Sequence, residues 1–220
     1  MMNLTNSIKV HEVKTDYDNV GRVYNTPYGC FHSVTTMLSN SGDKEFLQAW
    51  TERIGEEAAE RQTKIAANIG TDFHELGERF LLNETPGKVH FMSELLFKKA
   101  IPILEENVTA VHAVEIPLWS KVLRLAGRTD AIVDWNGKLA VFDYKCIGHH
   151  NPEWLEDYWV QVTLYAYMLK EMYGLTAEKL VLVVANKKSL KVKYFESTPN
   201  KHVKTAFNKI QAFRKKLDIA

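Results

Sequence analysis

Two acidic residues and a lysine are spaced in this chain so that they could form a hydrolytic site. Asp143 follows Asp130 by thirteen residues, and Lys145 follows Asp143 by two. Paired carboxylates offer the hard, anionic oxygens that Mg²⁺ and Mn²⁺ prefer as ligands. A bound ion of this kind activates water, and a nearby ammonium group can stabilise the charge that develops on the substrate.

A predicted β-hairpin must position these side chains. The Asn136-Gly137 dipeptide between two apolar runs is a strong signal for a two-residue turn. The register that this turn sets places Asp130 opposite Asp143 and Arg128 opposite Lys145. Because side chains alternate between the faces of a sheet, all four residues then share one face.

The same four residues allow two interpretations. Directly opposed side chains have Cβ atoms about 4.5–5.5 Å apart, and like charges there are destabilising. A divalent cation would compensate two facing carboxylates. Arg128 and Lys145 would also compensate them, in a structural ion network without a catalytic role. A bulge near Gly127 would shift the register. The residues alone leave both interpretations open.

The elements around the hairpin follow from hydrophobic period and from Gly and Pro breakers. We expect helices over 43–54, 56–69, 71–82, 88–106, 152–173 and 200–217, with Gly70 separating the second from the third. We expect strands over 111–118, 123–135, 139–146, 180–184 and 190–195. This order predicts an α/β (α+β) fold, with a mixed central sheet flanked by helices and a helical N-terminal half. We expect a single domain over 1–220, with a helical segment at about 43–106 and a sheet core at about 110–217.

The predicted helix over 152–173 carries one amide within an apolar stripe. Helical spacing puts five residues on one face, namely Trp154, Tyr158, Gln161, Tyr165 and Leu169. Packing against the sheet is the simpler explanation for the aromatic residues. An amide in such a stripe needs hydrogen-bond partners, so Gln161 is a candidate site residue.

Composition excludes several classes of protein. The 220 residues include 28 Lys and Arg and 27 Asp and Glu, with a net charge of +1 and 45% hydrophobic residues, as in ordinary globular domains. Cys30 and Cys146 are too few for a disulfide framework or an iron–sulfur cluster. The chain has no apolar run of membrane-spanning length and no signal-peptide pattern at its start. We expect a cytoplasmic protein that does not bind a membrane.

The C-terminal part of the chain is strongly basic. From Lys187 onward there are ten Lys and Arg residues and two acidic residues. Such a region faces phosphates in some proteins and is a solvated helix face in others, and charge alone does not decide between them. The candidate phosphate contacts are Lys201, Lys204, Lys215 and Lys216.

Four short motifs occur together in a characteristic order. They are Gly70-Thr71-Asp72-Phe73-His74, Gly127-Arg128-Thr129-Asp130, Asp143-Tyr144-Lys145, and Gln161 followed four residues later by Tyr165. In this combination the sequence resembles the RecB-like branch of the PD-(D/E)XK nuclease superfamily. Thr129 stands where the proline of the superfamily's name would be. Residues 32–38 are also similar to a segment of the mitochondrial genome maintenance exonucleases and their phage relatives.

The resemblance implies a restriction-endonuclease-like sheet and metal-dependent hydrolysis of DNA. It implies Mg²⁺ or Mn²⁺, and no iron–sulfur cluster, with ligands from His74, Asp130, Asp143 and the backbone carbonyl of Tyr144. Lys145 would orient the attacking water or stabilise developing charge, and these two roles stay open. The resemblance further implies that Gln161 holds the water or the phosphate. Tyr165 would contact the nucleic acid or brace Lys145, and Arg128 is a further candidate for phosphate binding.

The leading functional prediction is therefore a DNA exonuclease of replication, repair or recombination, in a bacterial or phage-infected cell. Its substrate would be single-stranded DNA or duplex DNA with ends. A catalytically silent DNA-binding accessory protein of the same fold is the alternative, and an α+β domain with a structural ion network is a third. Glu115 would be an outer ligand or a solvent-facing edge residue. Strand preference, cleavage polarity, oligomeric state and protein partners are not indicated.

Overall fold

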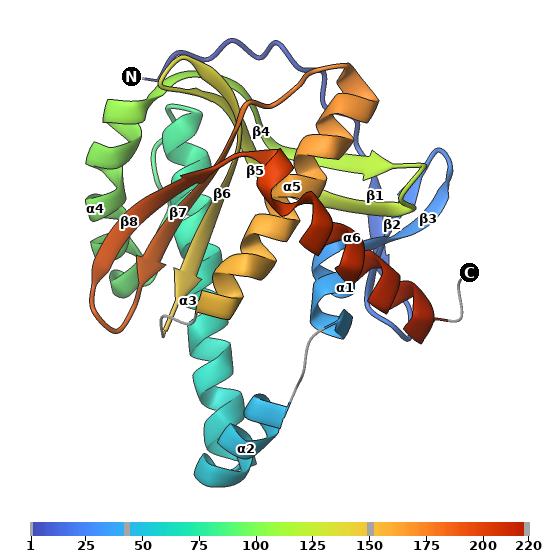
Figure 1. Cartoon of the computed structure of the whole chain (residues 1–220). Coiled ribbons are helices and arrows are strands. Elements are labelled where there is room, and N and C mark those ends of the chain that lie inside the picture. The colour runs from blue at the N-terminus through green and yellow to red at the C-terminus, as the bar shows by residue number, and fades with distance from the viewer. Residues whose placement is uncertain (1, 42–44, 149–151, 218–220) are drawn as a thin grey trace.

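A mixed β-sheet runs through the molecule, with helices on both of its faces (Figure 1). The structure is a computed structural model that describes residues 2–41, 45–148 and 152–217, without the side chains of 45–49 and 152–154. In this described part the sheet has eight strands. Seven follow the order β1-β2-β3-β5-β6-β7-β8, and β4 pairs with β5. The expected mixed sheet flanked by helices is confirmed.

The strands and helices have the following bounds. The strands are β1 (Lys14–Tyr17), β2 (Arg22–Thr26), β3 (Gly29–Ser33), β4 (Val108–Ser120), β5 (Leu125–Trp135), β6 (Lys138–Ile147), β7 (Lys179–Asn186) and β8 (Lys191–Ser197). The helices are α1 (Val34–Ser41), α2 (Glu45–Ile54), α3 (Glu56–Leu81), α4 (Phe91–Asn107), α5 (Pro152–Tyr173) and α6 (Pro199–Lys216). From β4 onward every expected element is present, with ends shifted by a few residues.

The N-terminal region contains an antiparallel meander, β1–β3, that the sequence did not predict. β3 joins the main sheet through a short parallel ladder with β5, in which His32 pairs with Leu125 and Ser33 with Ala126. The expected helical N-terminal half is wrong for this region, because the three short strands depend on cross-strand pairing more than on local propensity. Ser33 then begins α1 by accepting a hydrogen bond from Thr36 N (2.9 Å).

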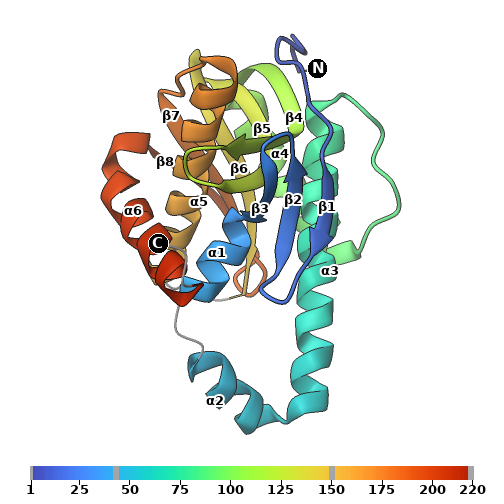
Figure 2. The ribbon, with the colours of Figure 1, turned by 90° about the vertical axis from the view of Figure 1, so that its right-hand side faces the viewer.

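Helix α3 is continuous over 26 residues, so the expected break at Gly70 is wrong. A glycine inside a helix costs only about 1 kcal/mol relative to alanine, which does not end a long helix. Gly77 instead provides room for a close approach to β6, because a Cβ there would lie 2.3 Å from Tyr144 Cε2. Figure 2 shows α2 and the first turns of α3 extending away from the sheet.

The hairpin of β5 and β6 has the predicted register over its outer half. Trp135 pairs with Lys138, and the ladder continues in register to Ala131 and Phe142. Both strands are covered on both faces, as predicted. Helices α3 and α4 pack on the face that carries Ala131 and Phe142. Helices α1, α5 and α6 pack on the opposite face.

Beyond Ala131 the two strands separate, and this corrects the predicted pairing of Asp130 with Asp143 and of Arg128 with Lys145. Residues 131–135 of β5 pair with β6, and residues 125–126 pair with β3. In the described ladders, residues 127–130 have no strand partner on this edge. We call these four residues the fork. The predicted register fails here because β3, from far away in the sequence, becomes the next neighbour of β5.

Two side chains of the fork replace the missing ladder bonds. Thr129 Oγ1 donates to the carbonyl oxygen of Phe142 (3.1 Å). Asp130 Oδ2 accepts a hydrogen bond from the backbone N–H of Tyr144 (2.6 Å). The carboxylate of Asp130 is therefore anchored to the backbone of β6 within the motif that contains Asp143.

None of the described helices is long and apolar enough to cross a membrane.

Candidate active site

Asp130 and His74 form the first half of the site. His74 projects from α3 and its Nδ1 lies 3.1 Å from Asp130 Oδ2 and 3.2 Å from Asp130 Oδ1. The His74 ring also meets the Tyr144 ring edge to face, at 5.9 Å between centroids. The upstream histidine and the downstream aspartate, 56 residues apart in sequence, thus converge at the fork as the motif order suggested.

Asp143, Lys145 and Gln161 form the second half. Lys145 Nζ lies 2.5 Å from Asp143 Oδ2 and donates to Gln161 Oε1 at 3.1 Å. Gln161 Nε2 in turn donates to Asp143 Oδ1 at 3.3 Å. The carboxylate and the amide are both almost fully buried. The amide that stood out in an apolar stripe therefore has its partners, and they are the two candidate residues of β6.

Aromatic side chains of α5 enclose these polar groups. The Lys145 ammonium lies 5.0 Å from the centre of the Tyr158 ring, and the hydroxyl of Tyr165 lies 3.2 Å from Gln161 Nε2. Tyr165 is 2% exposed, so in this structure it supports Gln161 and does not face solvent. The side chain of Trp154 lies outside the described residues. Helix α5 therefore supplies both a wall and a hydrogen-bonding group to the site.

The two carboxylates have different protonation behaviour. Burial by itself raises the pKa of Asp130, but His74, Lys145 and the Tyr144 N–H outweigh it, so that this pKa lies below its ordinary value. Burial, together with the like charge of Asp130, raises the pKa of Asp143 to about 6, although Lys145 opposes the rise. The pKa of Asp143 is thus raised even though the Lys145 ammonium lies beside it. The protein therefore compensates the negative charge of ionised Asp143 only in part.

The pKa values of the two basic partners, Lys145 and His74, are both raised. Burial lowers the pKa of Lys145, but the carboxylates of Asp143 and Asp130 more than offset this and the pKa lies above its ordinary value. Burial likewise lowers the pKa of His74, and Asp130 raises it to above the ordinary value. Lys145 therefore presents a fixed positive charge and not a neutral amine that could act as a base.

Glu115 and Arg128 lie next to the fork. Arg128 does not face Lys145, and its Nη1 lies 3.7 Å from Glu115 Oε2. Glu115 has a positive φ of 50° in β4, and burial and the charge of Asp130 raise its pKa to about 7. Glu115 lies in β4, whose described ladder is with β5, and its carboxylate is close enough to Asp130 for that charge to act on it. The contact between the Asp130 carboxylate and the Tyr144 N–H had no signal in the sequence, because it depends on the fork.

The donor chemistry of the site suits a divalent cation. Asp130 and His74 are in contact, and the charge of Asp130 acts on Asp143. The raised pKa of Asp143 indicates negative charge that a cation would compensate. Among the described residues, no three His, Cys, Asp or Glu side chains are already arranged as ligands of one ion. In this conformation Lys145 Nζ lies beside Asp143 Oδ2, and His74 Nδ1 lies 3.1 Å from Asp130 Oδ2.

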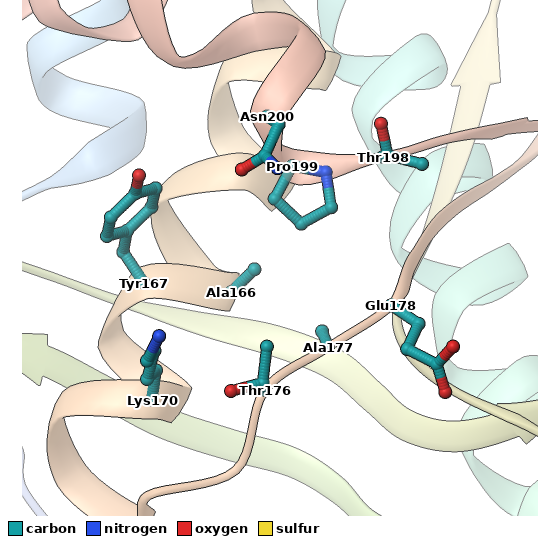
Figure 3. Close-up of a pocket in the computed structure, with 9 residues that line it drawn as sticks. All are labelled: Ala166, Tyr167, Lys170, Thr176, Ala177, Glu178, Thr198, Pro199 and Asn200. Carbon is teal, nitrogen blue, oxygen red and sulfur yellow. The ribbon is translucent and has the colours of Figure 1, made fainter.

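The predicted phosphate contacts on α6 lie apart from these groups. Lys201, Lys204, Lys215 and Lys216 are all exposed, and Lys216 Nζ donates to the carbonyl oxygen of Asn40 (2.6 Å). A cavity of about 430 Å³ lies between the end of α5 and the start of α6 (Figure 3). Tyr167, Lys170 and Pro199 line it, and none of the candidate site residues does. The site at the fork is therefore not this cavity.

Comparison with known proteins agrees with these motifs. The sequence model of the PD-(D/E)XK nuclease superfamily matches residues 36–218 of the chain. Mitochondrial genome maintenance exonuclease 1 of Mus musculus is 27% identical over 146 residues, which are 62% of this chain and 43% of that protein. The chain thus spans less than half the length of this relative. The crystal structure of SSO0001 matches with a TM-score of 0.39 and 16% identity, over 80% of this chain and 74% of that one.

Proposed function

The chain belongs to the PD-(D/E)XK nuclease superfamily, and from this premise we propose that it is a metal-dependent deoxyribonuclease that degrades DNA from its ends. The observation that carries the proposal is the linked group of Asp143, Lys145 and Gln161 beside the Asp130–His74 pair. These residues come from α3, β5, β6 and α5, and the side chains within each of the two groups contact one another.

The metal-binding part of the proposal concerns the acidic side of this group. Asp130, Asp143, His74 and the backbone carbonyl of Tyr144 would hold Mg²⁺ or Mn²⁺, which supplies an activated water and neutralises charge on the scissile phosphate. The protein's own contribution is to fix the two carboxylates: Asp130 through the Tyr144 N–H and Asp143 through Gln161.

The basic side of the group acts on the substrate. The Lys145 ammonium is held between Asp143 and the amide of Gln161, where it can stabilise negative charge on a phosphate oxygen. Its raised pKa supports this role over that of a base. Gln161 orients the attacking water or the phosphate, and Tyr165 braces Gln161 from behind.

The substrate part of the proposal is DNA, single-stranded or duplex with ends, in replication, repair or recombination. The likeness to an exonuclease supports action at ends, and it covers less than half of that protein. Arg128 and the lysines of α6 (Lys201, Lys204, Lys215 and Lys216) would contact phosphates along the strand. The alternative is a catalytically silent DNA-binding protein. The chain contains all three of Asp130, Asp143 and Lys145, which argues against this alternative.

Linear and circular DNA test the proposal directly. We expect the chain to degrade labelled linear DNA with Mg²⁺ or Mn²⁺, to spare circular DNA of the same sequence and to be inactive in EDTA. Asp143→Asn and Lys145→Ala should abolish cleavage while DNA binding survives, since affinity comes from distributed phosphate contacts. Cleavage of circular DNA would show that the protein is an endonuclease and not an exonuclease. DNA binding without cleavage would favour the silent accessory protein.

A further inference from the structure

A second, cationic pocket lies away from the carboxylates. It has a volume of about 290 Å³ and lies between the end of β3, the β4–β5 turn and the last turns of α6. Figure 1 shows this part of α6 passing α1 toward β2 and β3. Its polar lining is His32, Arg124 and Arg214, with Cys30 beside them and Leu125 and Phe213 among its apolar walls.

The charge of this pocket is not balanced by acidic groups of the described lining, which contains neither Asp nor Glu. Of the ion pairs between described side chains, none involves Arg124 or Arg214, while His32 Nε2 lies 2.9 Å from Asp18 Oδ2. Arg124 and Arg214 both line the pocket, so an anion there would meet positive charge that no acidic side chain of the described lining offsets.

Contacts within the protein hold both guanidinium groups in place. Arg214 Nη2 donates to the carbonyl oxygen of Leu123 (3.0 Å), so this side chain is fixed against the β4–β5 turn. Arg124 lies over the ring of Phe31, at 5.7 Å from its centre. A guanidinium has five N–H donors, and one anchoring contact leaves the others for a ligand. Groups that are already oriented lose less entropy when they bind.

The shape of the donor set selects the ligand class. A guanidinium binds two oxygens of a phosphate at once, which makes arginine the preferred residue for phosphate recognition. Leu125 lies in the pocket and Asp130 lies five residues further along β5, which corresponds to about 17 Å of strand. A phosphate in this pocket is therefore not the one that is cleaved at the fork.

We propose that the Arg124–Arg214 pocket binds a backbone phosphate of the nucleic acid, remote from the scissile one. The proposal rests on the proposed nuclease function in that it assumes a nucleic-acid substrate. It assigns to this pocket the anchoring of the strand, while the fork carries out the hydrolysis. Free inorganic phosphate and free nucleotides present the same chemical group, and the experiment below distinguishes them.

Binding measured in EDTA tests the pocket without cleavage. The full chain, the Arg124→Gln/Arg214→Gln variant and the Lys191→Gln/Lys193→Gln variant are titrated into a fluorescein-labelled oligonucleotide at several salt concentrations. Lys191 and Lys193 are exposed on β8, at the opposite edge of the sheet, so this control removes the same charge. We expect the arginine variant to bind about tenfold or more weakly, with a salt slope reduced by about 0.7–0.9 because one phosphate is no longer bound. An equal loss of affinity in the arginine variant and in the Lys191→Gln/Lys193→Gln variant would disprove a specific role of the pocket in phosphate binding.

The Arg124→Lys/Arg214→Lys variant tests whether weaker binding by the glutamine variant is caused only by misfolding. It keeps the charge and removes the two-pronged donor, so we expect binding between those of the wild type and the glutamine variant, at an unchanged thermal melting temperature. Wild-type affinity in this lysine variant would overturn the role of the guanidinium geometry.

Cys30 gives a second readout at the pocket itself. In a Cys146→Ala background, alkylation of the exposed Cys30 thiol is followed with inorganic phosphate, deoxyadenosine monophosphate or the oligonucleotide. Protection by the oligonucleotide at the lowest phosphate concentration supports a backbone phosphate. Protection by inorganic phosphate or the nucleotide alone, or by none of the three, overturns it.

The two proposals fail differently. The wild type could bind the oligonucleotide through Arg124 and Arg214 but fail to cleave DNA in Mg²⁺ or Mn²⁺. That result would disprove the nuclease function and support the phosphate-binding pocket. The wild type could instead cleave DNA with metal while the arginine variant binds DNA as well as the Lys191/Lys193 control does. That result would disprove the phosphate-binding pocket and support the nuclease function.

Discussion

The ring of Tyr165 occupies the space that a side chain at position 127 would need. A Cβ on Gly127 would lie 2.5 Å from Tyr165 Cε1 and 2.7 Å from its hydroxyl oxygen. Because the same hydroxyl contacts Gln161 Nε2, the glycine of one motif controls the position of the amide in another. The fork thus needs a glycine for close approach as well as an aspartate for chemistry.

Gly127→Ala should therefore impair activity and stability together. The added methyl group must displace the Tyr165 ring, and overpacking of this kind costs about 1–3 kcal/mol. Displacement of Tyr165 also removes a contact of Gln161, so we expect cleavage to fall by more than the decrease in folded protein explains. Chemical denaturation and cleavage rates measured on the same preparation separate the two effects.

Gly70→Ala is the matched control for that substitution. A Cβ at Gly70 would lie 4.0 Å from Cys146 Cβ, an ordinary contact, and α3 is continuous there. Replacing a helical glycine by alanine should stabilise the protein by up to about 1 kcal/mol. Equal destabilisation by both alanine variants would contradict the close-approach explanation for Gly127.

Gln161→Leu should cut turnover by about a hundredfold and also destabilise the protein. Leucine fits an apolar stripe, but it leaves Lys145 Nζ, Asp143 Oδ1 and the Tyr165 hydroxyl without the amide. Each buried polar group that is left without its partner costs about 1–3 kcal/mol. Turnover under saturating DNA and melting temperature are the measurements.

Thr163→Val controls for burial on the same helix. Thr163 is fully buried, and its hydroxyl has no hydrogen-bond partner among the described residues, so valine removes a polar group without breaking a bond seen there. We expect unchanged turnover. If the Gln161→Leu variant retained full activity, Gln161 would be a structural residue only.

Metal ions should raise the melting temperature of the wild type. A ligand that binds only the folded state adds about 2.7 kcal/mol at a hundredfold excess over its Kd. Asp130→Asn should lose most of this gain. The variant should also be less stable than the wild type in EDTA at pH 7, because the ionised carboxylate is stabilised by His74, Lys145 and the Tyr144 N–H. Directly opposed carboxylates would have had the reverse effect in EDTA.

Asp134→Asn is the control on the same strand. It removes a carboxylate that pairs with His112 at 2.9 Å, outside the fork. This variant should keep the full response to Mg²⁺ or Mn²⁺. A wild-type melting temperature that does not respond to either ion would disprove the shared metal site.

Glu115→Gln should make stability less dependent on pH. The pKa of Glu115 is raised from its ordinary value of 4.5 to about 7, so between these values the folded state retains a proton that the unfolded state releases. The stabilising contribution is present below pH 4.5 and is lost as pH rises through 7. The variant in EDTA should match the wild type at about pH 4 and exceed it at about pH 8. An equal difference at both pH values would contradict the raised pKa.

Replacing all four α6 lysines by glutamine should weaken DNA binding and its salt dependence. The four residues are exposed on one helix, and the salt slope falls by about 0.7–0.9 for each phosphate that is no longer bound. They are Lys201, Lys204, Lys215 and Lys216. An unchanged slope in a fluorescence titration would show that this surface is only solvated.

Local sequence signals predicted the hairpin well and the fork badly, for a physical reason. The Asn136-Gly137 turn sets the register only as far as both strands remain neighbours, which is to Ala131 and Phe142. The position of β3 beside β5 depends on a segment far upstream, and no local pattern encodes it. Asp130 and Asp143 are still linked beyond the ladder, because the Asp130 carboxylate accepts the N–H of Tyr144, the residue after Asp143.

Glycine shows the same limit. Helix propensity treats Gly70 and Gly77 alike, yet one has room for a methyl group and the other faces the ring of Tyr144. A glycine that ends a helix and a glycine that admits a neighbouring strand look identical in one sequence. Gln161 was easier to identify, because an amide among apolar residues conflicts with its surroundings unless partners exist.

The bond from the Tyr144 N–H to Asp130 makes one backbone proton a sensor of the whole site. Its acceptor is a titratable carboxylate and not a carbonyl of a neighbouring strand. Any change at Asp130, whether protonation, an ion or a substitution, must alter the strength of this bond. The resonance of a single amide in an NMR spectrum, and its rate of exchange with deuterium, would therefore report the state of the site without a substrate or a label.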